Sequence, residues 1–483
     1  MLMYQRVYEI LKNKIEGGLL PAGASLPSRA ALACTFGISE KTVRRVMAML
    51  EADGLVETAQ RKRPVVAARR DAGHLTTALA LKKIDADMTS DVLKTGVLLC
   101  YPVIKKGIAR CERTDLQIPR RILENMEIGS PPEFWKLSKQ FYRFFVARNE
   151  NALIVQAVDS LGLSDLKPLH DDIEMRTRYY RQLQQFMTTL ETGGAPESVH
   201  FDDMSGIYGT TAGGSAFQAS ADSPLLLGRK QLEKTLREAD ERYSAVYMDI
   251  IGLIAAGRYR RGDRLPSHKE LQAIYGVSVD TTRRAIQILR DLGVVRTVRG
   301  SGIFVEMNRD GIRQITLPPH LIACHVRRYL DTLELLALTA EGAAACAAAQ
   351  AAPSAVQAAQ AEIDRLWNRD YLYGRSPAVL LDFIVRHIGI DAFSVIYVLL
   401  QRNFRIGRSI PGLLTTEKTA LNCEIHQQCV DTVKLLSAGS REAFAARSAD
   451  LFERIRRLVI EACRRLGYYE AAAGVYDGAA LWK

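Results

Sequence analysis

Two pairs of adjacent arginines, each in a stretch with helical spacing of apolar residues, could bind phosphate. Arg44-Arg45 lies in GISEKTVRRVMAMLEADGLV and Arg283-Arg284 in GVSVDTTRRAIQILRDLGVV. Each phosphate that a lysine or arginine neutralises releases condensed counterions, which favours the binding of a polyanion. The residue types and their spacing therefore indicate a polyanion-binding surface.

The positive charge of the chain is concentrated around these two stretches. The 483 residues carry a formal net charge of +11. Residues 1–70 hold 12 Lys and Arg against 6 Asp and Glu, and residues 241–310 hold 12 against 8, so these two segments contribute +10. The rest of the chain is close to neutral. Clustered positive charge of this kind is typical of nucleic-acid binding.

The two stretches belong to one long internal repeat. The chain aligns with itself without a gap at an offset of 239 positions, which pairs Leu26-Pro27-Ser28 with Leu265-Pro266-Ser267 and Gly54 with Gly293. This period is too long for a solenoid or propeller unit. We interpret it as a tandem copy of a whole module.

Each copy predicts three helices followed by a β-ribbon. The second helix begins after Ser28 or Ser267, and Ser267 with Glu270 forms the pattern of a capping box. The third helix follows a turn with glycine, which is the arrangement of a helix-turn-helix. The ribbon, or wing, has its tip at 60–63 in the first copy and at 299–302 in the second.

The remaining segments are mostly helical, which makes the predicted fold class mainly α. The range 193–228 is rich in Gly, Ser and Ala and predicts a flexible linker. The predicted domains are a winged helix-turn-helix at 1–70, a helical domain at 75–192, the linker at 193–228, a second winged helix-turn-helix at 240–308 and a second helical domain at 318–470.

LPSRAALACTFGISEKTVRRVMAMLEADGLVE and LPSHKELQAIYGVSVDTTRRAIQILRDLGVVRTVRGSGIFV resemble the winged helix-turn-helix of GntR-type transcription regulators. The helical segments resemble degenerate members of the effector domain of the FadR-like branch. The resemblance implies a dimer whose recognition helices enter successive major grooves of an operator, with wings in the minor groove and a small organic acid as effector. Because one chain carries both readers, we expect an intramolecular pseudo-dimer, which could also form a homodimer.

The resemblance places the DNA contacts on the second helix, the recognition helix and the wing of each copy. The residues expected to contact DNA are Arg29, Lys41, Thr42, Arg44, Arg45, Arg61, Lys62, Arg63, His268, Lys269, Thr281, Thr282, Arg283, Arg284, Arg299, Gly300, Ser301 and Gly302. The copies differ at several of these positions, which predicts different half-sites. An alternative is that one copy no longer binds DNA, because Glu40 or Asp280 could repel phosphate as well as accept from cytosine.

Helical domains of this type often hold a metal through Asp and His residues on facing helices. The matching positions in the second half include Asp382 and His426 but only one histidine, so we expect no metal site. An effector is expected at Asp382, Arg386 and His426. No cofactor is implied.

The predicted function is a DNA-binding transcription regulator, a repressor with two non-identical readers and a small-molecule effector. The alternative is a regulator whose helical domains are ligand-free dimerisation scaffolds. The chain contains no GxSxG, HExxH, P-loop or Rossmann signature, so we expect no enzyme. His170-Asp171-Asp172 could suggest an acid–base cluster, but acids at a helix start favour the dipole. We expect no apolar run long enough for a membrane span, and a cytoplasmic protein.

Overall fold

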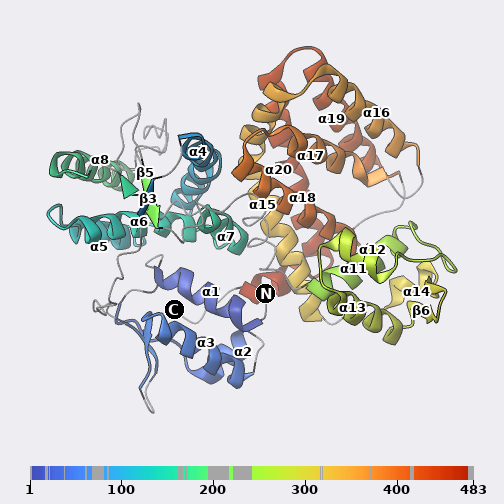
Figure 1. Cartoon of the computed structure of the whole chain (residues 1–483), viewed down its shortest axis with the longest axis horizontal. Helices are drawn as coiled ribbons and strands as arrows, with labels where there is room; N and C mark the ends of the chain where they lie inside the picture. The colour runs from blue at the N-terminus through green and yellow to red at the C-terminus, as the bar shows by residue number, and fades with distance from the viewer. Residues whose placement is uncertain are drawn as a thin grey trace. The chain divides into compact units, whose positions relative to one another are not determined.

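The computed structural model describes most of the chain and divides it into two compact units (Figure 1). The described residues are 3–16, 20, 22–36, 39–59, 63–67, 81–83, 86–161, 167–168, 171–193, 217–220, 242–315, 317, 319–369, 373–413 and 418–476. We call 3–67 reader 1, 86–193 helical domain 1, 242–305 reader 2 and 309–476 helical domain 2. The first two belong to one unit, and the last two, except for a short segment at 390–396, belong to the other.

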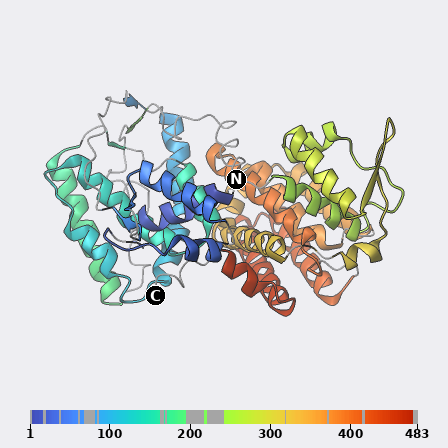
Figure 2. The same cartoon turned by 90° about the horizontal axis from the view of Figure 1, so that it is seen from below.

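Each reader has three helices and a two-stranded antiparallel ribbon, as the sequence predicts. Reader 1 consists of α1 (Met3–Glu16), α2 (Arg29–Phe36), α3 (Glu40–Ala52), β1 (Val56–Glu57) and β2 (Val65–Val66). Reader 2 consists of α11 (Arg242–Ala255), α12 (His268–Tyr275), α13 (Val279–Asp291), β6 (Val295–Val298) and β7 (Gly302–Val305). The β6–β7 hairpin extends away from the three helices (Figure 2).

The cores of the two readers use matching positions. Leu11, Leu26 and Leu50 are fully buried in reader 1, and Ile250, Leu265 and Leu289 are buried at the corresponding positions of reader 2. These apolar residues recur every three or four positions in the helices, so one face of each helix is buried and the opposite face stays exposed. The burial pattern therefore leaves the polar face of α3 and α13 available to solvent.

Helical domain 1 is built around a cluster of aromatic rings. Its helices are α4 (Ala86–Ala109), α5 (Gln117–Glu124), α6 (Pro131–Ala147), α7 (Ala152–Ser160) and α8 (Ile173–Glu191). Phe141 and Phe145 of α6 each make edge contacts with Phe186 of α8, with ring centroids 5.8 Å apart. A Cβ on Gly107 would lie 1.8 Å from the carbonyl oxygen of Phe145, so only glycine permits this approach of α4 to α6.

A small antiparallel sheet accompanies helical domain 1. It consists of β3 (Leu81–Lys83), β5 (Phe217–Ser220) and β4 (Lys167–Pro168), in that order. β5 lies inside the range 193–228, which the sequence predicts to be a flexible linker. That prediction is wrong for these four residues, because their backbone groups pair with two other strands. Residues 194–216 and 221–228 lie outside the described part of the chain.

Helical domain 2 is a bundle around the long helix α15 (Pro319–Gln350). The other elements are α14 (Arg309–Gln314), α16 (Pro353–Trp367), η4 (Tyr373–Arg375), α17 (Ser376–His387), α18 (Asp391–Phe404), η5 (Arg405–Ser409), α19 (Ala420–Ser437), α20 (Arg441–Arg465) and α21 (Tyr469–Tyr476). α15 packs mainly against α20, α21 and α17. Leu333, Leu336 and Ala340 of α15 are fully buried, as expected for the central helix of a bundle.

α15 also corrects an expectation from the sequence about membrane spans. Residues Leu321–Gln350 are long and apolar enough to cross a membrane, which the sequence analysis did not expect of any segment. However, 61% of the most apolar stretch is buried inside the structure. Burial of this extent is typical of the core helix of a bundle, which is apolar because its neighbours cover most of its surface.

Candidate nucleic-acid interface

The two recognition helices begin in the same way. Ser39 caps α3, because its Oγ accepts a hydrogen bond from the backbone N of Thr42 at 3.2 Å, and Ser278 caps α13 through the N of Thr281 at the same distance. The hydroxyl groups of Thr42 and Thr281 each lie 2.9 Å from the capping serine Oγ. Both threonines, expected as DNA contacts, are therefore also part of the cap that starts the recognition helix.

The exposed face of α13 carries the arginines of reader 2. Arg283 and Arg284 are exposed, whereas Ala285, Ile286 and Leu289 are buried. Arg283 makes an ion pair with Asp280 at 3.2 Å, but the side chains are 68% and 89% exposed, so water screens this pair strongly. The pair leaves most of the guanidinium hydrogens of Arg283 available for another partner.

Thr282 is a correction to the expected set of DNA contacts. Its side chain is fully buried, and its hydroxyl donates to the carbonyl of Val279 at 2.7 Å. The same hydroxyl lies 3.0 Å from Nδ1 of His268, the first residue of α12. Thr282 lies one position before Arg283, on the inner side of the helix, so its side chain faces the interior of reader 2 and contacts His268 there.

His268 is held beside the recognition helix in a positively charged environment. Partial burial and the charge of Arg283 lower the pKa of His268 below its ordinary value, so the imidazole is neutral at pH 7. Lys269, the next residue, is exposed. α12 begins with a complete capping box between Ser267 and Glu270, which fixes the start of the helix at His268. The neutral His268 thus lies between two cationic side chains, Lys269 and Arg283, at the start of α12 and α13.

Reader 1 presents a corresponding but different face. Lys41, Arg44 and Arg45 are exposed on α3, and Arg29 is exposed at the first position of α2. Arg45 is already engaged, because its guanidinium lies over the ring of Tyr4, 3.7 Å from the centroid, and donates to the Tyr4 hydroxyl at 2.9 Å. Lys41 and Arg44 therefore contribute the more available charges of this face.

The wing of reader 2 depends on two glycines. Gly300 and Gly302 have φ values of 77° and 122°, which residues with a side chain rarely adopt. The backbone N of Ser301 donates to the carbonyl of Val298 at 3.0 Å and closes the turn, and Arg299 is exposed beside it. In reader 1, Arg63 is exposed at the end of the wing tip that leads into β2, while Arg61 and Lys62 lie outside the described residues.

The sequence analysis missed a group of arginines in the loop before α12. This loop pairs with β7: Leu265 N donates to the carbonyl of Ile303, and Val305 N donates to that of Asp263. The Nε of Arg264 lies 2.8 Å from the position that a Cβ on Gly302 would occupy, so this guanidinium borders the wing turn. The exposed arginines of the loop are Arg258, Arg260, Arg261 and Arg264.

A comparison of the two copies could have revealed these arginines. At the offset of 239 positions, reader 1 has the uncharged residues Leu19, Pro21, Ala22 and Ser25 in their place. The family resemblance did not point to the loop, but the gain of four arginines against one aspartate, Asp263, between copies of one module does. Arg261 and Arg296 both pair with Glu306, at 3.5 and 2.8 Å, so part of this charge is locally neutralised.

The residues expected to bind an effector do not converge on one site. Asp382 of α17 accepts a hydrogen bond from Gln401 at 2.6 Å, and Arg386 is exposed at the end of the same helix. His426 of α19 lies 2.9 Å from the hydroxyl of Ser376 and stacks on Trp367, with the ring centroids 4.1 Å apart. Burial lowers the pKa of His426. Among the described residues, no hydrogen bond or ion pair joins the three.

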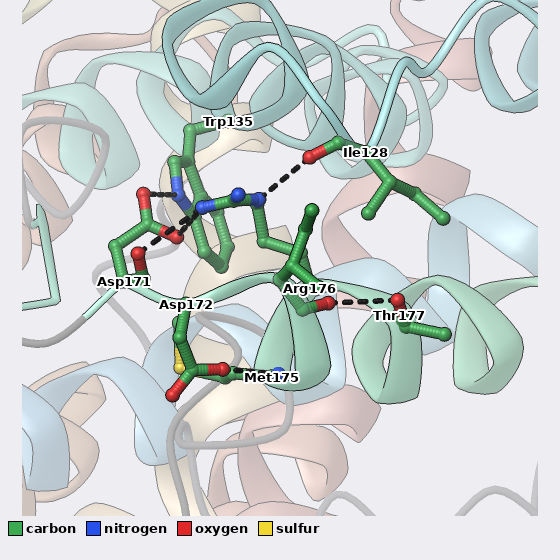
Figure 3. Close-up of polar contacts among 8 residues, drawn as sticks. Ile128, Trp135, Asp171, Asp172, Met175, Arg176 and Thr177 are labelled. Atoms are coloured by element: carbon green, nitrogen blue, oxygen red, sulfur yellow. Dashed lines mark hydrogen bonds and ion pairs between the residues drawn. The ribbon is translucent and has the colours of Figure 1, made fainter.

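Asp171 and Asp172 have structural partners in helical domain 1 (Figure 3). Asp171 accepts from the indole Nε1 of Trp135 at 2.9 Å and pairs with the buried guanidinium of Arg176. Asp172 caps α8 by accepting from the backbone N of Met175 at 2.7 Å. Both carboxylates therefore hold α8 in place, in agreement with the interpretation of this segment as a helix start.

The fold and this surface define the class of each reader, which is a winged helix-turn-helix domain. Residues 3–66 and 242–305 both match the family model described as "Bacterial regulatory proteins, gntR family". The two segments are gntR-type helix-turn-helix domains, present as a tandem duplication. The matches end with the wing of each reader, so the assignment of the helical domains to the FadR-like branch stays a prediction.

Curated relatives are similar to this chain over the length of one reader. The HTH-type transcriptional regulator TreR of Bacillus subtilis (strain 168) is 38% identical over 69 residues, which is 14% of this chain and 29% of the relative. The putative HTH-type transcriptional regulator RmpR of Mycobacterium gastri is 39% identical over 79 residues, 16% of this chain and 28% of the relative. The match thus spans less than a third of each relative's own length.

Solved structures give a weaker similarity. A GntR protein of Streptococcus agalactiae is 18% identical, with a TM-score of 0.21, and the match covers 44% of this chain and 99% of that one. A putative transcriptional regulator GntR from Rhodococcus sp. RHA1 is 18% identical, with a TM-score of 0.22, over 46% of this chain and 99% of that one. TM-scores this low carry no information about the arrangement of this chain.

Proposed function

We propose that this protein is a sequence-specific transcription regulator, a repressor, that reads an operator with two non-identical readers on one chain. The observation that carries the proposal is the pair of capped recognition helices with exposed arginines, each followed by a wing. Phosphate contacts from the arginines supply affinity, and side chains at the helix starts contact base edges. The two readers act as an intramolecular pseudo-dimer, and two chains can also pair.

The readers bind different half-sites under this proposal. Reader 2 has four loop arginines and a glycine wing turn, whereas reader 1 has a cationic wing tip and an uncharged loop. A cationic tip suits a narrow minor groove with enhanced negative potential. Because the two readers carry their positive charge at different places, we expect the operator to be asymmetric and not palindromic.

Footprinting of the full chain on the DNA upstream of its own gene tests the proposal. We expect two protected half-sites of different sequence, and a reporter under that promoter that is expressed more strongly when the gene is deleted. Protection that is uniform along the DNA and disappears with competitor DNA of random sequence would contradict sequence-specific binding. A single protected half-site would support the alternative that one reader no longer binds DNA.

The proposed effector is a small organic acid bound by helical domain 2. The candidate residues Asp382, Arg386 and His426 are separate among the described contacts, which favours the alternative of a ligand-free scaffold as a second candidate. A thermal-shift screen with organic acids and divalent metals distinguishes the two. An acid at one hundred times its dissociation constant stabilises the folded protein by about 2.7 kcal/mol and raises the melting temperature. A scaffold shows no such rise.

The proposed regulator acts in the cytoplasm and has no enzymatic activity. The burial of α15 supports a core helix rather than a membrane span, and the match of both readers to gntR-type domains supports a protein that works on DNA. Asp171 and Asp172 are occupied with structural partners and are unsuitable as a general acid and base. Cell fractionation that places the protein in the soluble fraction tests the location.

A further inference from the structure

Reader 2 is attached to helical domain 2 at two separate places. The first is the chain connection itself: Ile312 of α14 and Leu321 of α15 belong to the same hydrophobic cluster as the reader core. The second is η5, a short helical segment far away in sequence that lies against α11. A body that is held at one place can swivel, whereas attachment through two different elements fixes its orientation.

At the second attachment the two backbones approach closely. A Cβ on Gly252 of α11 would lie 2.4 Å from the carbonyl oxygen of Arg408 and 2.9 Å from its carbonyl carbon. Real Cβ atoms do not approach backbone atoms to this distance, so any other residue at 252 would separate α11 from η5. On its other side, η5 packs on α15: a Cβ on Gly407 would lie 2.6 Å from the ring of the buried Tyr329.

A buried ion pair joins the two elements. Arg408 donates from Nε to Oδ1 of Asp249 at 2.6 Å and from Nη2 to Oδ2 at 2.8 Å, a bidentate arrangement. The hydroxyl of Tyr275, the last residue of α12, donates to Oδ2 of Asp249 at 2.7 Å. The side chains of Arg408 and Asp249 are 19% and 10% exposed. Charges this far from water depend strongly on each other, because an unpaired buried charge is costly.

The carboxylate of Asp249 thus connects three elements at once: α11, α12 and η5. Burial opposes the charge of Arg408, but its hydrogen bonds to Asp249 outweigh this effect and raise the pKa of the guanidinium. Burial and the nearby Asp249 raise the pKa of Tyr275, so the phenol stays protonated and continues to donate. Both directions favour the charged guanidinium of Arg408 and the protonated hydroxyl of Tyr275 that the contact requires.

Reader 1 lacks the residues that make this contact. At the offset of 239 positions, Ile10 occupies the place of Asp249, Phe36 that of Tyr275 and Asn13 that of Gly252. An isoleucine and a phenylalanine cannot accept or donate the hydrogen bonds of the ion pair. The difference lies outside the DNA-facing side chains, so it does not concern the half-site sequence that reader 1 recognises.

We propose that η5 locks reader 2 onto helical domain 2, and that Asp249, Tyr275 and Arg408 are positioning residues for the binding of an operator with two half-sites. The inference rests on the proposed function. The lock fixes the orientation of reader 2 on helical domain 2, so reader 2 loses less rotational freedom when it binds its half-site after reader 1 has bound. This smaller loss of freedom raises the effective concentration of reader 2 at its half-site. It also makes the affinity depend on the spacing between the two half-sites.

Two variants of the full chain open the contact in different ways. Gly252→Ala inserts a Cβ between α11 and η5, while alanine at this helical position favours α11 itself. Arg408→Gln leaves the buried carboxylate of Asp249 without its counter-ion. The double variant Asp249→Asn with Arg408→Gln removes both charges and should restore the contact. Asn13→Ala, at the matching position of reader 1, is the control.

Hydrogen exchange of the free protein measures the lock without DNA. We expect faster amide exchange in peptides covering 242–255 and 405–413 for Gly252→Ala and Arg408→Gln, and wild-type exchange for the double variant and for Asn13→Ala. Wild-type protection of both segments in Gly252→Ala would overturn the proposal, because the contact would then not depend on the close approach.

Binding to synthetic duplexes measures the positioning role. A duplex with only the reader 2 half-site should bind all variants equally, since the DNA-facing side chains are unchanged. A duplex with both half-sites should bind the two opened variants about tenfold more weakly and with a flatter dependence on spacing. Equal affinity and spacing dependence in variants that exchange faster would overturn the proposal. If the wild type binds no duplex, the proposed function fails, while hydrogen exchange still decides whether the lock exists.

Discussion

At the scale of single residues, Arg283 is the side chain on which phosphate binding by reader 2 depends most directly. It is 68% exposed on α13, and its only ion pair among the described residues is the exposed one with Asp280. Arg283→Ala should weaken the binding of an operator duplex and reduce the slope of log affinity against log salt by about one. Fluorescence anisotropy at four or five salt concentrations measures this slope.

The control for Arg283 is an exposed arginine outside the readers. Arg447 on α20 is also exposed, and Arg447→Ala should leave both affinity and slope unchanged. A slope for Arg283→Ala that equals that of Arg447→Ala would rule out a phosphate contact at position 283.

His268 predicts a pH dependence of DNA binding. Burial and Arg283 lower its pKa in the free protein, and a phosphate beside it would offset the charge of Arg283 and raise that pKa again. The complex then binds more protons than the free protein, so the affinity should rise as the pH falls from about 7.5 to about 6, by at most about tenfold per pH unit for one proton. Anisotropy titrations across this range at constant salt measure the effect.

The pH profile needs two comparison variants. His268→Gln should flatten the profile, whereas His387→Gln, a histidine of α17 in helical domain 2, should keep it. If His268→Gln retains the wild-type profile, the proton is taken up elsewhere.

At the scale of elements, α8 provides a paired test of two neighbouring aspartates (Figure 3). Asp171→Asn removes the negative charge from Arg176, whose side chain is only 6% exposed. We expect the free energy of unfolding to fall by about 2–3 kcal/mol, less than the full cost of breaking a buried pair, because Arg176 keeps its bond to the carbonyl of Ile128. Urea denaturation followed by circular dichroism measures it.

Asp172→Asn is the matched control for this element. Asparagine caps a helix about as well as aspartate, so the free energy of unfolding should change by less than roughly 0.5 kcal/mol. Equal destabilisation by the two substitutions would mean that Asp171 contributes only through its position near the helix start.

The limits of sequence reasoning are visible in particular elements. The start of the second helix of reader 2 follows from a local pattern, and the structure confirms the capping box between Ser267 and Glu270. The alanine-rich segment 337–361 has helical composition throughout, but α15 ends at Gln350 and α16 begins at Pro353. Proline lacks a backbone N–H and clashes with the preceding turn, so it begins a new helix instead of continuing the old one.

At the scale of the whole molecule, the two readers differ in where they carry positive charge. The tip of the first wing holds Arg61, Lys62 and Arg63, and the charge of reader 2 lies in its loop before α12. Replacement of all three wing residues by alanine should weaken binding to the reader 1 half-site and reduce its salt slope by up to about three. Binding to the reader 2 half-site should not change.

Duplexes with one intact half-site each, and the other replaced by unrelated sequence, separate the two contributions. Equal losses on both duplexes would contradict the assignment of the wings to different half-sites. Arg264→Ser, which gives reader 2 the residue found at the matching position Ser25, supplies the reciprocal variant. It should affect the reader 2 half-site alone.

The sequence by itself determined the features of this protein that depend on local residue patterns and on the internal repeat. The duplication, the three helices and wing of each copy, the serine caps and the exposed arginine pairs all follow from residue spacing, because these features are set by neighbours within a few positions. These patterns were sufficient to identify the resemblance of the two segments to gntR-type domains, and the family match confirms this resemblance.

Only the tertiary structure decided which side chains meet across the chain. The sequence predicts Thr282 as a DNA contact, but its side chain points inward to His268. Successive helical residues are rotated by about 100°, so Thr282 and its exposed neighbour Arg283 face different sides. Asp249 and Arg408 are separated by 159 positions, and no local pattern pairs them. The placement of such residues depends on how whole elements pack, and burial then makes their charges interdependent.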